Sequence, residues 1–262
     1  MNELLKRSIF GLLYVLIVIF ALQSFEGAGF LFLVFMLIGL SEFSKLTNLH
    51  FSTILLPSIF VFLAFFLFYY ENGIIDLKLI QITLAFVLIT LFVPLIFFIF
   101  DKISKDMLGN FYLAMVYLAL PFSLAMGIPL KLLLAVFVII WASDTFAYLT
   151  GKYFGKHKLA EKISPKKTIE GFVGGLVGSL IVGFAYYKYI GIGVELSVGM
   201  FIFLTVIIVI AGTLGDLLES RFKRLAGVKD SGTLIPGHGG VLDRLDSFIL
   251  AVPFVFIFLL LI

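Results

Sequence analysis

The chain has 262 residues, of which 62% are hydrophobic and 13% charged, and its formal net charge at pH 7 is +3. A soluble domain would be about half apolar and about a quarter charged, so the composition excludes an ordinary water-soluble protein. The absence of cysteine excludes disulfide bonds and thiolate metal sites. Apolar runs of about twenty residues recur along the chain and predict an all-α, polytopic integral membrane protein. A transmembrane β-barrel would show short alternating segments instead.

These runs predict nine transmembrane helices. The first run follows Lys6 and Arg7 as the apolar core of a signal peptide would, but no A-x-A-like cleavage site comes after it, so we expect a retained helix. Pro57 and Pro94 fall within or near apolar runs, where neighbouring helices satisfy the backbone groups that proline leaves free. The nine ranges are roughly 8–24, 28–46, 53–70, 77–100, 107–126, 129–150, 169–190, 197–215 and 245–262.

The distribution of basic residues predicts the orientation of these helices. If the N-terminus is cytoplasmic, 16 of the 19 lysine and arginine residues face the cytoplasm, and only Lys78, Lys131 and Lys188 lie on the other side. Cytoplasmic loops of membrane proteins carry such an excess of positive charge. We therefore expect the N-terminus and two polar loops, residues 151–168 and 216–244, in the cytoplasm, and the C-terminus on the far side.

An acidic residue lies inside the sixth predicted span. Asp144 belongs to the stretch WASDTFAYLTGKYFG and precedes the point, near Thr150, where the helix is expected to leave the bilayer. A carboxylate within a span is costly to bury and usually faces a polar cavity. An interhelical hydrogen bond or ion pair with no chemical role is the alternative, but the cost of burial favours a functional site.

The polar loop that follows contains six lysines within sixteen residues. An ordinary cytoplasmic loop, or a patch for anionic lipid head groups, accounts for the first three of them. In the sequence SPKKT at residues 164–168, the proline keeps the residue before it out of helical geometry, and a new helix is expected to begin at its end. Lys166 and Lys167 therefore lie beside a helix start and form a candidate anion site. Gly174 and Gly178, farther along this helix, predict close packing against another helix.

The most polar stretch of the chain covers residues 215–246. It holds five acidic residues, five basic residues, a histidine and six glycines. If the eighth helix continues into this stretch, Asp216, Glu219, Ser220 and Lys223 fall on one helix face. An apolar membrane protein concentrates such residues where it handles a highly charged ligand.

The middle of this stretch, VKDSGTLIPGHGG, has no helical period and is predicted to be a loop. Gly239 and Gly240 beside His238 allow the backbone to approach a phosphate closely, although no P-loop pattern is present. The histidine is either a structural or surface residue, or a contact for a phosphate or leaving group, since imidazole titrates near neutral pH.

Four carboxylates are the candidate metal ligands. Asp243 and Asp246 lie three residues apart, on one face of the last helix. Stabilisation of the helix dipole explains Asp243 adequately. It explains Asp246 poorly, because burial at the membrane boundary has a cost that a bound cation would offset. Carboxylates suit Mg²⁺, and lysine and arginine suit phosphates, so Asp216, Asp243 and Asp246, with Asp144 near them, are predicted to bind metal beside a polyphosphate.

Residues 220–246 read S-x-F-K-R-x4-K-D-S-G-x2-I-P-G-H-G-G-V-x-D-R-L-D. This pattern resembles the consensus motif of the phosphatidate cytidylyltransferases, the CDP-diacylglycerol synthases, with no departure over the whole stretch. Two further stretches resemble the same family, W-A-S-D-T-x-A-Y at residues 141–148 and S-P-K-K-T-x-E-G at residues 164–171. The resemblance is strong in the C-terminal half, whereas for residues 1–130 it rests on hydropathy alone.

The resemblance implies a multi-pass enzyme of the plasma (inner) membrane that transfers CMP from CTP to phosphatidic acid and releases pyrophosphate. It also implies a need for Mg²⁺, as one or two ions, and a homodimer. CTP, phosphatidic acid and membrane lipid are the expected partners, and no nucleic acid is expected. Residues 129–262 would form the catalytic region with its two cytoplasmic loops, and residues 1–128 a lipid-facing scaffold.

Within such an enzyme a phosphate oxygen of phosphatidate would attack the α-phosphorus of CTP in line. Catalysis would depend on positioning and on neutralising charge, and no general base is required because a phosphate monoester is already ionised near neutral pH. The predicted catalytic residues are Asp144, Asp216, Asp243, Asp246, Lys229 and His238, and the predicted substrate-binding residues are Lys166, Lys167, Ser220, Lys223, Arg224, Gly239, Gly240 and Arg244.

Two other functions fit parts of the pattern. An ion or solute transporter would use Asp144, Asp216 and Asp246 as an intramembrane relay, but transporters place such charges near the midplane and repeat them between halves. Here the charges gather at one face. A membrane kinase acting on a polyprenol would also combine carboxylates with basic loops, and it would release CDP from CTP instead of pyrophosphate. The CDP-alcohol phosphotransferase pattern D-G-x2-A-R-x8-G-x3-D-x3-D is absent.

Overall fold

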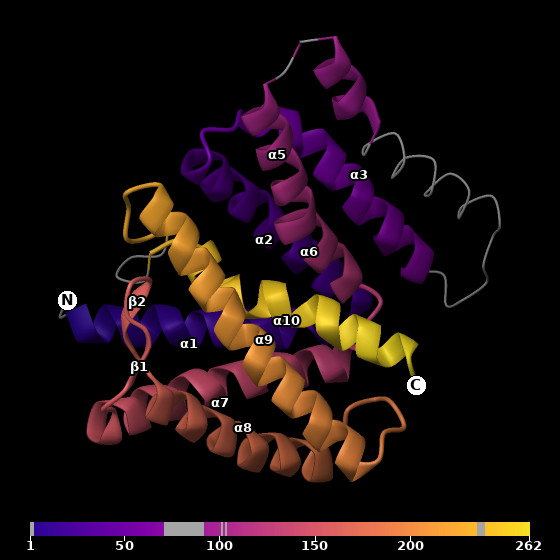
Figure 1. Ribbon diagram of the computed structural model, residues 1–262. Helices are drawn as coiled ribbons and strands as arrows, with labels where there is room; N and C mark the ends of the chain where they lie inside the picture. The colour runs from indigo at the N-terminus through magenta and orange to yellow at the C-terminus, as the bar shows by residue number, and fades with distance from the viewer. Residues whose placement is uncertain (1–2, 71–91, 101, 103, 235–238) are drawn as a thin grey trace.

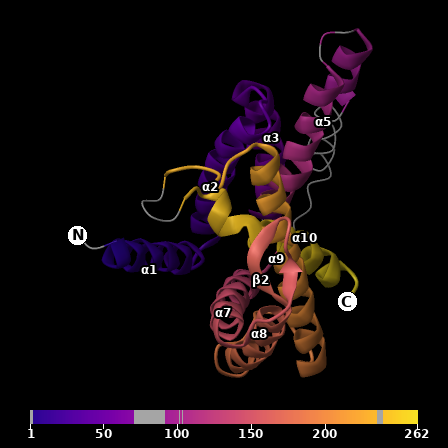
Figure 2. The ribbon, with the colours of Figure 1, turned by 60° about the vertical axis from the view of Figure 1, so that its left-hand side comes forward.

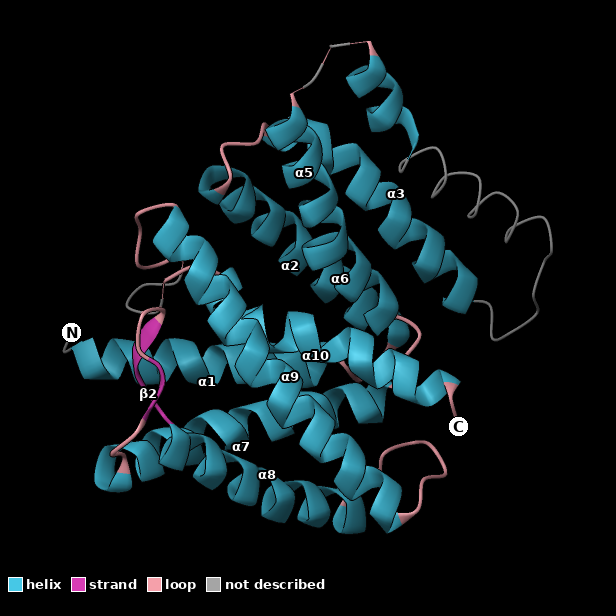
Figure 3. Ribbon diagram, viewed as in Figure 1, coloured by secondary structure: helices cyan, strands magenta, loops and turns pink. Residues whose placement is uncertain are grey.

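The computed structural model describes residues 3–70, 92–100, 102, 104–234 and 239–262 (Figure 1). Within these residues the chain is helical, apart from two short strands and the connections (Figure 3). Residues 92–99 are helical as well. The elements are α1 (Glu3–Ala21), α2 (Phe25–Leu46), α3 (Phe51–Tyr70), α5 (Lys105–Ala114), the π-helical turn η1 (Met115–Ala119), α6 (Leu120–Ala125), α7 (Leu130–Phe154), β1 (Lys158–Ala160), β2 (Ser164–Thr168), α8 (Ile169–Tyr189), α9 (Val198–Leu225) and α10 (Leu242–Leu260).

Six of the described helices are long and apolar enough to cross a membrane: α2, α3, the continuous segment Lys105–Ala125, α7, α8 and α9. α1 adds a shorter apolar stretch, Ser8–Ala21, and α10 is 19 residues long with charged side chains in its first turns. The predicted helical membrane protein is therefore confirmed. The expected total of nine spans stays a prediction, because most of the 77–100 span lies outside the described residues.

The polar segment 151–168, expected as a loop, is more ordered than predicted. It begins with the end of α7 and continues as β1 and β2, which pair antiparallel with Lys158 opposite Thr168. The Thr168 hydroxyl then accepts a hydrogen bond from the N–H of Gly171 at 3.1 Å and so caps α8. The helix start expected beside Thr168 is confirmed.

The second polar segment, 216–244, also begins as a helix. α9 continues ten residues beyond the predicted end of its span at residue 215 and stops at Leu225, so the charged face expected for a continuing helix does form. The described residues 226–234 that follow contain no helix or strand, in agreement with the predicted loop. Both polar segments are thus held by the ends of long helices.

Glycines hold α8 against α7, and the two helices run side by side in both views (Figures 1 and 2). A Cβ added at Gly175 would lie 2.8 Å from the carbonyl oxygen of Ser143 in α7. Gly174 and Gly178 also face side chains of α7, which confirms the packing role predicted for them. Small residues let helix backbones approach closely within a membrane.

Helix α10 joins the two halves of the protein. It packs against α9 and α7 on one side and against α2 and α6 on the other. The Phe248 ring stacks on Phe137 of α7 and on Phe32 of α2, with ring centroids 4.4 Å and 5.5 Å apart. In Figure 1 the N-terminus and the β1–β2 hairpin lie on one side of the molecule, and the C-terminus lies on the opposite side.

Replacing Gly175 by alanine should destabilise the protein, because the new methyl group would overlap the backbone carbonyl of Ser143. Overpacking of this kind costs about 1–3 kcal/mol. Thermal unfolding of the detergent-purified variant should therefore begin at a lower temperature than that of the wild type. Gly199→Ala is the matched control, since no atom lies within 4 Å of its added Cβ. Equal melting of the two variants would contradict the tight α7–α8 contact.

Candidate functional site

A cavity of about 500 Å³ opens where the last turns of α7 meet β2, the start of α8 and the polar part of α9. Asp144 of α7, Asp216 of α9, and Lys166 and Lys167 of β2 line this cavity. Candidate residues from three separate stretches of the sequence therefore come together in space. Lys152 lines the cavity as well, and two carboxylates beside three lysines suit a ligand that carries both phosphates and a cation.

The carboxylates at this cavity are close enough to repel one another. Asp216 is neutralised in part by Lys167, whose Nζ lies 2.6 Å from Oδ2, and its Oδ1 accepts a hydrogen bond from the Ser220 hydroxyl at 3.2 Å. The charge of Asp216 acts on both Asp144 and Asp246. Like charges held together in this way favour the binding of a cation between them.

Close contact between α9 and α10 places Asp216 and Asp246 side by side. A Cβ added at Gly212 would come within 3.3 Å of the Ser247 Cβ, and Gly215 lies directly against the backbone carbonyl of Asp246. Two glycines one turn apart thus let α9 approach the beginning of α10. The acidic residue that follows Gly215 is carried to the same place.

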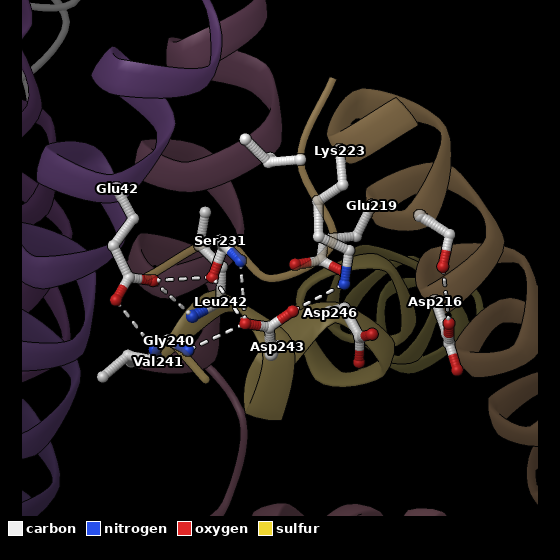
Figure 4. Close-up of polar contacts among 12 residues, drawn as sticks. Glu42, Asp216, Glu219, Lys223, Ser231, Gly240, Val241, Leu242, Asp243 and Asp246 are labelled. Atoms are coloured by element: carbon white, nitrogen blue, oxygen red, sulfur yellow. Dashed lines mark hydrogen bonds and ion pairs between the residues drawn. The ribbon is translucent and has the colours of Figure 1, made fainter. Parts of the chain in front are cut away.

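A buried group of charges adjoins the cavity (Figure 4). Lys223 of α9 forms ion pairs with Glu219, one turn earlier, and with Asp243, whose Oδ1 lies 2.5 Å from Nζ. The side chains of Glu219, Lys223 and Asp243 are 1%, 10% and 9% exposed. Burial of an ion pair needs close partners on every charge, so Lys223 offsets part of the negative charge of this cluster, and its contact with the substrate stays a prediction.

Asp243 is engaged on both of its oxygens. Its Oδ1 pairs with Lys223, and its Oδ2 accepts the N–H of Ser231 at 2.9 Å, the Ser231 hydroxyl at 2.9 Å and the N–H of Gly240 at 2.7 Å. Gly239 has φ +83°, and a Cβ there would lie 2.6 Å from Oδ2 of Asp243. Asp243 therefore ties the two described ends of the 231–240 loop to the start of α10.

Sequence reasoning missed one buried carboxylate that contacts the same loop. Glu42 of α2 is 5% exposed and accepts hydrogen bonds from the N–H of Val241 at 3.0 Å, the N–H of Leu242 at 2.9 Å and the Ser231 hydroxyl at 3.0 Å (Figure 4). The signal was present in the sequence, since an acidic residue inside an apolar run had already singled out Asp144.

The remaining candidate residues lie at the edge of this arrangement. Arg224 donates a hydrogen bond to the carbonyl oxygen of Val228 at 3.0 Å and so closes the end of α9. Lys229 is exposed on the loop, and Arg244 is exposed in the first turn of α10. His238 lies outside the described residues, so its role stays a prediction.

A family model for the cytidylyltransferase family matches residues 5–262. The chain belongs to this family. A phosphatidate cytidylyltransferase of Staphylococcus haemolyticus is 49% identical over 131 residues, 50% of this chain and 50% of that protein. The protein of the same name from Staphylococcus aureus (strain COL) is 51% identical over 131 residues, with the same coverage. That from Haemophilus influenzae is 52% identical over 128 residues, 48% of this chain and 44% of that protein. The chain thus spans about half the length of the curated relatives it matches.

The carboxylates of this family member fit a divalent cation in donor chemistry, since Mg²⁺ prefers carboxylate oxygens. Asp144, Asp216 and Asp246 repel one another and gain from a positive charge between them. Asp243 fits less well, because both of its oxygens are already engaged. Among the described residues no three acidic or histidine side chains converge on one point, so the three aspartates would have to turn toward a shared ion.

Replacement of Lys223 by methionine should destabilise the protein strongly, because Glu219 and Asp243 would be left as buried carboxylates without a cation. Breaking a buried ion pair costs about 3–5 kcal/mol. Thermal unfolding without any substrate measures the effect, and Arg221→Met, on the exposed face of the same helix, is the matched control. Wild-type stability of the Lys223 variant would show instead that this lysine is available for a ligand.

Proposed function

We propose that this protein transfers CMP from CTP to phosphatidic acid, forming CDP-diacylglycerol and pyrophosphate. Membership of the cytidylyltransferase family and the names of the curated relatives support this activity. The observation that carries it is the cavity in which Asp144 and Asp216 meet Lys166 and Lys167. A site at the ends of membrane-spanning helices is open to a water-soluble nucleotide while its lipid substrate stays in the bilayer.

In this proposal an oxygen of the phosphatidate phosphate forms a bond to the α-phosphorus of CTP. The bond from that phosphorus to the bridging oxygen of the β-phosphate breaks, and pyrophosphate leaves with the electron pair. Lys166 and Lys167 bind the phosphates and hold the attacking and leaving oxygens in line. In the structure, Lys167 pairs with Asp216. Because Lys167 lines the cavity, its ammonium group is also close enough to bind a phosphate that enters there.

We propose that Asp144, Asp216 and Asp246 hold Mg²⁺, as one or two ions. When bound, the metal supplies positive charge to the phosphates of the nucleotide and so favours both attack on phosphorus and departure of pyrophosphate. Ser220, which donates a hydrogen bond to Asp216, orients one of these carboxylates. Lys229 and Arg244, exposed beside the loop, contribute further positive charge to substrate binding, and Gly239 and Gly240 form the loop backbone near the phosphates.

We also propose how the chain crosses the membrane. Nine spans, with the N-terminus and the two polar segments in the cytoplasm, give both substrates access to one face. The hairpin and the polar end of α9 are then exposed to cytoplasmic CTP, and the C-terminus lies beyond the opposite face of the bilayer. We further propose a homodimer and no nucleic-acid partner, as the resemblance implies.

Transfer of radiolabel tests the proposed reaction directly. The detergent-purified protein, given CTP labelled at the α-phosphate together with phosphatidic acid, should move label into the lipid phase only when Mg²⁺ is present. Pyrophosphate should appear in equal amount. Release of CDP would indicate a kinase instead, and folded protein that leaves the lipid unlabelled would overturn the proposal.

Replacement of Asp246 by asparagine should lower this activity by about 100-fold or more, because a charge-stabilising group at the phosphates is lost. Its melting temperature should not fall, since the change removes repulsion with Asp144 and Asp216. Initial rates and thermal unfolding measure the two effects. Asp106→Asn, exposed at the first turn of α5, is the matched control and should keep full activity. Near-normal turnover by the Asp246 variant would refute its assignment as a metal ligand.

A further inference from the structure

We propose that Glu42 is a positioning residue for CMP transfer, acting from α2 on the loop that leads into α10. The inference rests on the proposed function, because the loop is assigned there to the phosphates. Glu42 lies about 200 residues before its contacts in the chain, where no similarity of sequence had suggested a role. Its contacts connect the N-terminal half of the protein to the acidic end of α10.

Glu42 supplies the helix cap that the sequence at the start of α10 lacks. The residue in the N-cap position is Val241, whose side chain makes no capping hydrogen bond. The first N–H groups of a helix need acceptors, and a negative charge beside them is favourable. The two oxygens of Glu42 accept hydrogen bonds from the N–H groups of Val241 and Leu242. One side chain from α2 therefore supplies both the acceptors and the negative charge at the start of α10.

The loop backbone is shaped to this carboxylate at two glycines. A Cβ added at Gly232 would lie 2.5 Å from Oε1 of Glu42, and one added at Gly240 would lie 2.5 Å from Oε2. The two described ends of the loop thus rest on the same group, one on each oxygen. A larger residue at Gly232 would have to displace Glu42, and one at Gly240 would have to displace Glu42 and the Ser231 hydroxyl.

A short chain of hydrogen bonds leads from Glu42 to the charged cluster. The Ser231 hydroxyl lies 3.0 Å from Oε2 of Glu42 and 2.9 Å from Oδ2 of Asp243. Asp243 in turn pairs with Lys223, and Asp246 follows one turn later on the same helix. Because Glu42 holds both described ends of the loop and the start of α10, it adds to the α9–α10 contact in keeping Asp246 in place beside Asp216. Active-site groups held only loosely lose catalytic efficiency.

The test compares Glu42→Gln, Glu42→Asp and Glu26→Gln in the full-length protein. Glutamine keeps the size of the side chain, but one of its two acceptor oxygens becomes an NH₂ donor that faces another N–H donor. Glu26 is an exposed glutamate at the start of the same helix and serves as the matched control. We expect kcat to fall about 10- to 100-fold in Glu42→Gln, the KM for phosphatidic acid to stay unchanged, and Glu42→Asp to recover part of the rate.

Hydrogen–deuterium exchange supplies a readout that does not depend on activity. The amides of Val241 and Leu242 should exchange faster in Glu42→Gln than in wild type or Glu26→Gln. The comparison is made under conditions in which the three proteins have the same overall stability. Unchanged exchange would overturn the capping contact, and faster exchange with unchanged kcat would reduce Glu42 to a structural residue. If the wild type transfers no CMP, the proposed function fails while the exchange data still test the contact.

Should Glu42→Gln fail to fold, Ser231→Ala replaces it in both assays. This variant removes the hydroxyl that lies between Glu42 and Asp243 but keeps both carboxylates. The expected result is a smaller loss of kcat in the same direction, with faster exchange in peptides covering residues 239–242. A wild-type rate together with wild-type exchange would contradict the proposed link.

Discussion

The need to neutralise charges inside a largely apolar protein governs the arrangement of the C-terminal half. Glu219 and Asp243 are buried, and Lys223 pairs with both of them. Separation of α9 from α10 would break the pair between Lys223 and Asp243. Asp243 would then be an unpaired charge in a medium of low dielectric constant, which is very unfavourable. The ion cluster therefore fixes two helices to each other, and the glycines that permit their contact determine how closely they approach.

This fixed pair of helices explains why carboxylates gather beside the cavity, which lysines also line. The close packing of α9 on α10 brings Asp216 and Asp246 next to each other, and Asp144 reaches the same region from α7. Lys167 reduces the repulsion from the hairpin side, where β2 delivers it next to Asp216. One set of charges is thus paired within the protein and holds the two helices together, whereas the neighbouring set is only partly paired and suits a ligand. A charge-poor membrane protein keeps such an unsatisfied set where binding supplies the missing partners.

The sequence predicted the helical spans and most of the candidate residues because both rest on strong local signals. An apolar run of sufficient length has few alternatives to a spanning helix, and Asp144 and Asp216 each interrupt or end such a run. The hairpin was missed because Pro165 and the lysines around it break helical periodicity without alternating as a strand does. The different contacts of the acidic residues were also not predictable, since Asp243 and Asp246 have the same residue type and lie three positions apart at the start of the same helix. Only the folded chain shows that Lys223, Ser231 and Gly240 engage Asp243.

Glu42 shows why spacing within a motif cannot describe the whole site. Its position is set by how α2 packs against α10, and the intervening helices determine that packing. Once packed, a side chain from the first half of the protein performs the capping that Val241 lacks, and Gly232 and Gly240 leave room for it. Residues 1–128, expected as a scaffold, therefore contribute a polar contact of their own to the loop. At the two described ends of this loop, Gly232 and Gly240 lie directly against a carboxylate that comes from another helix.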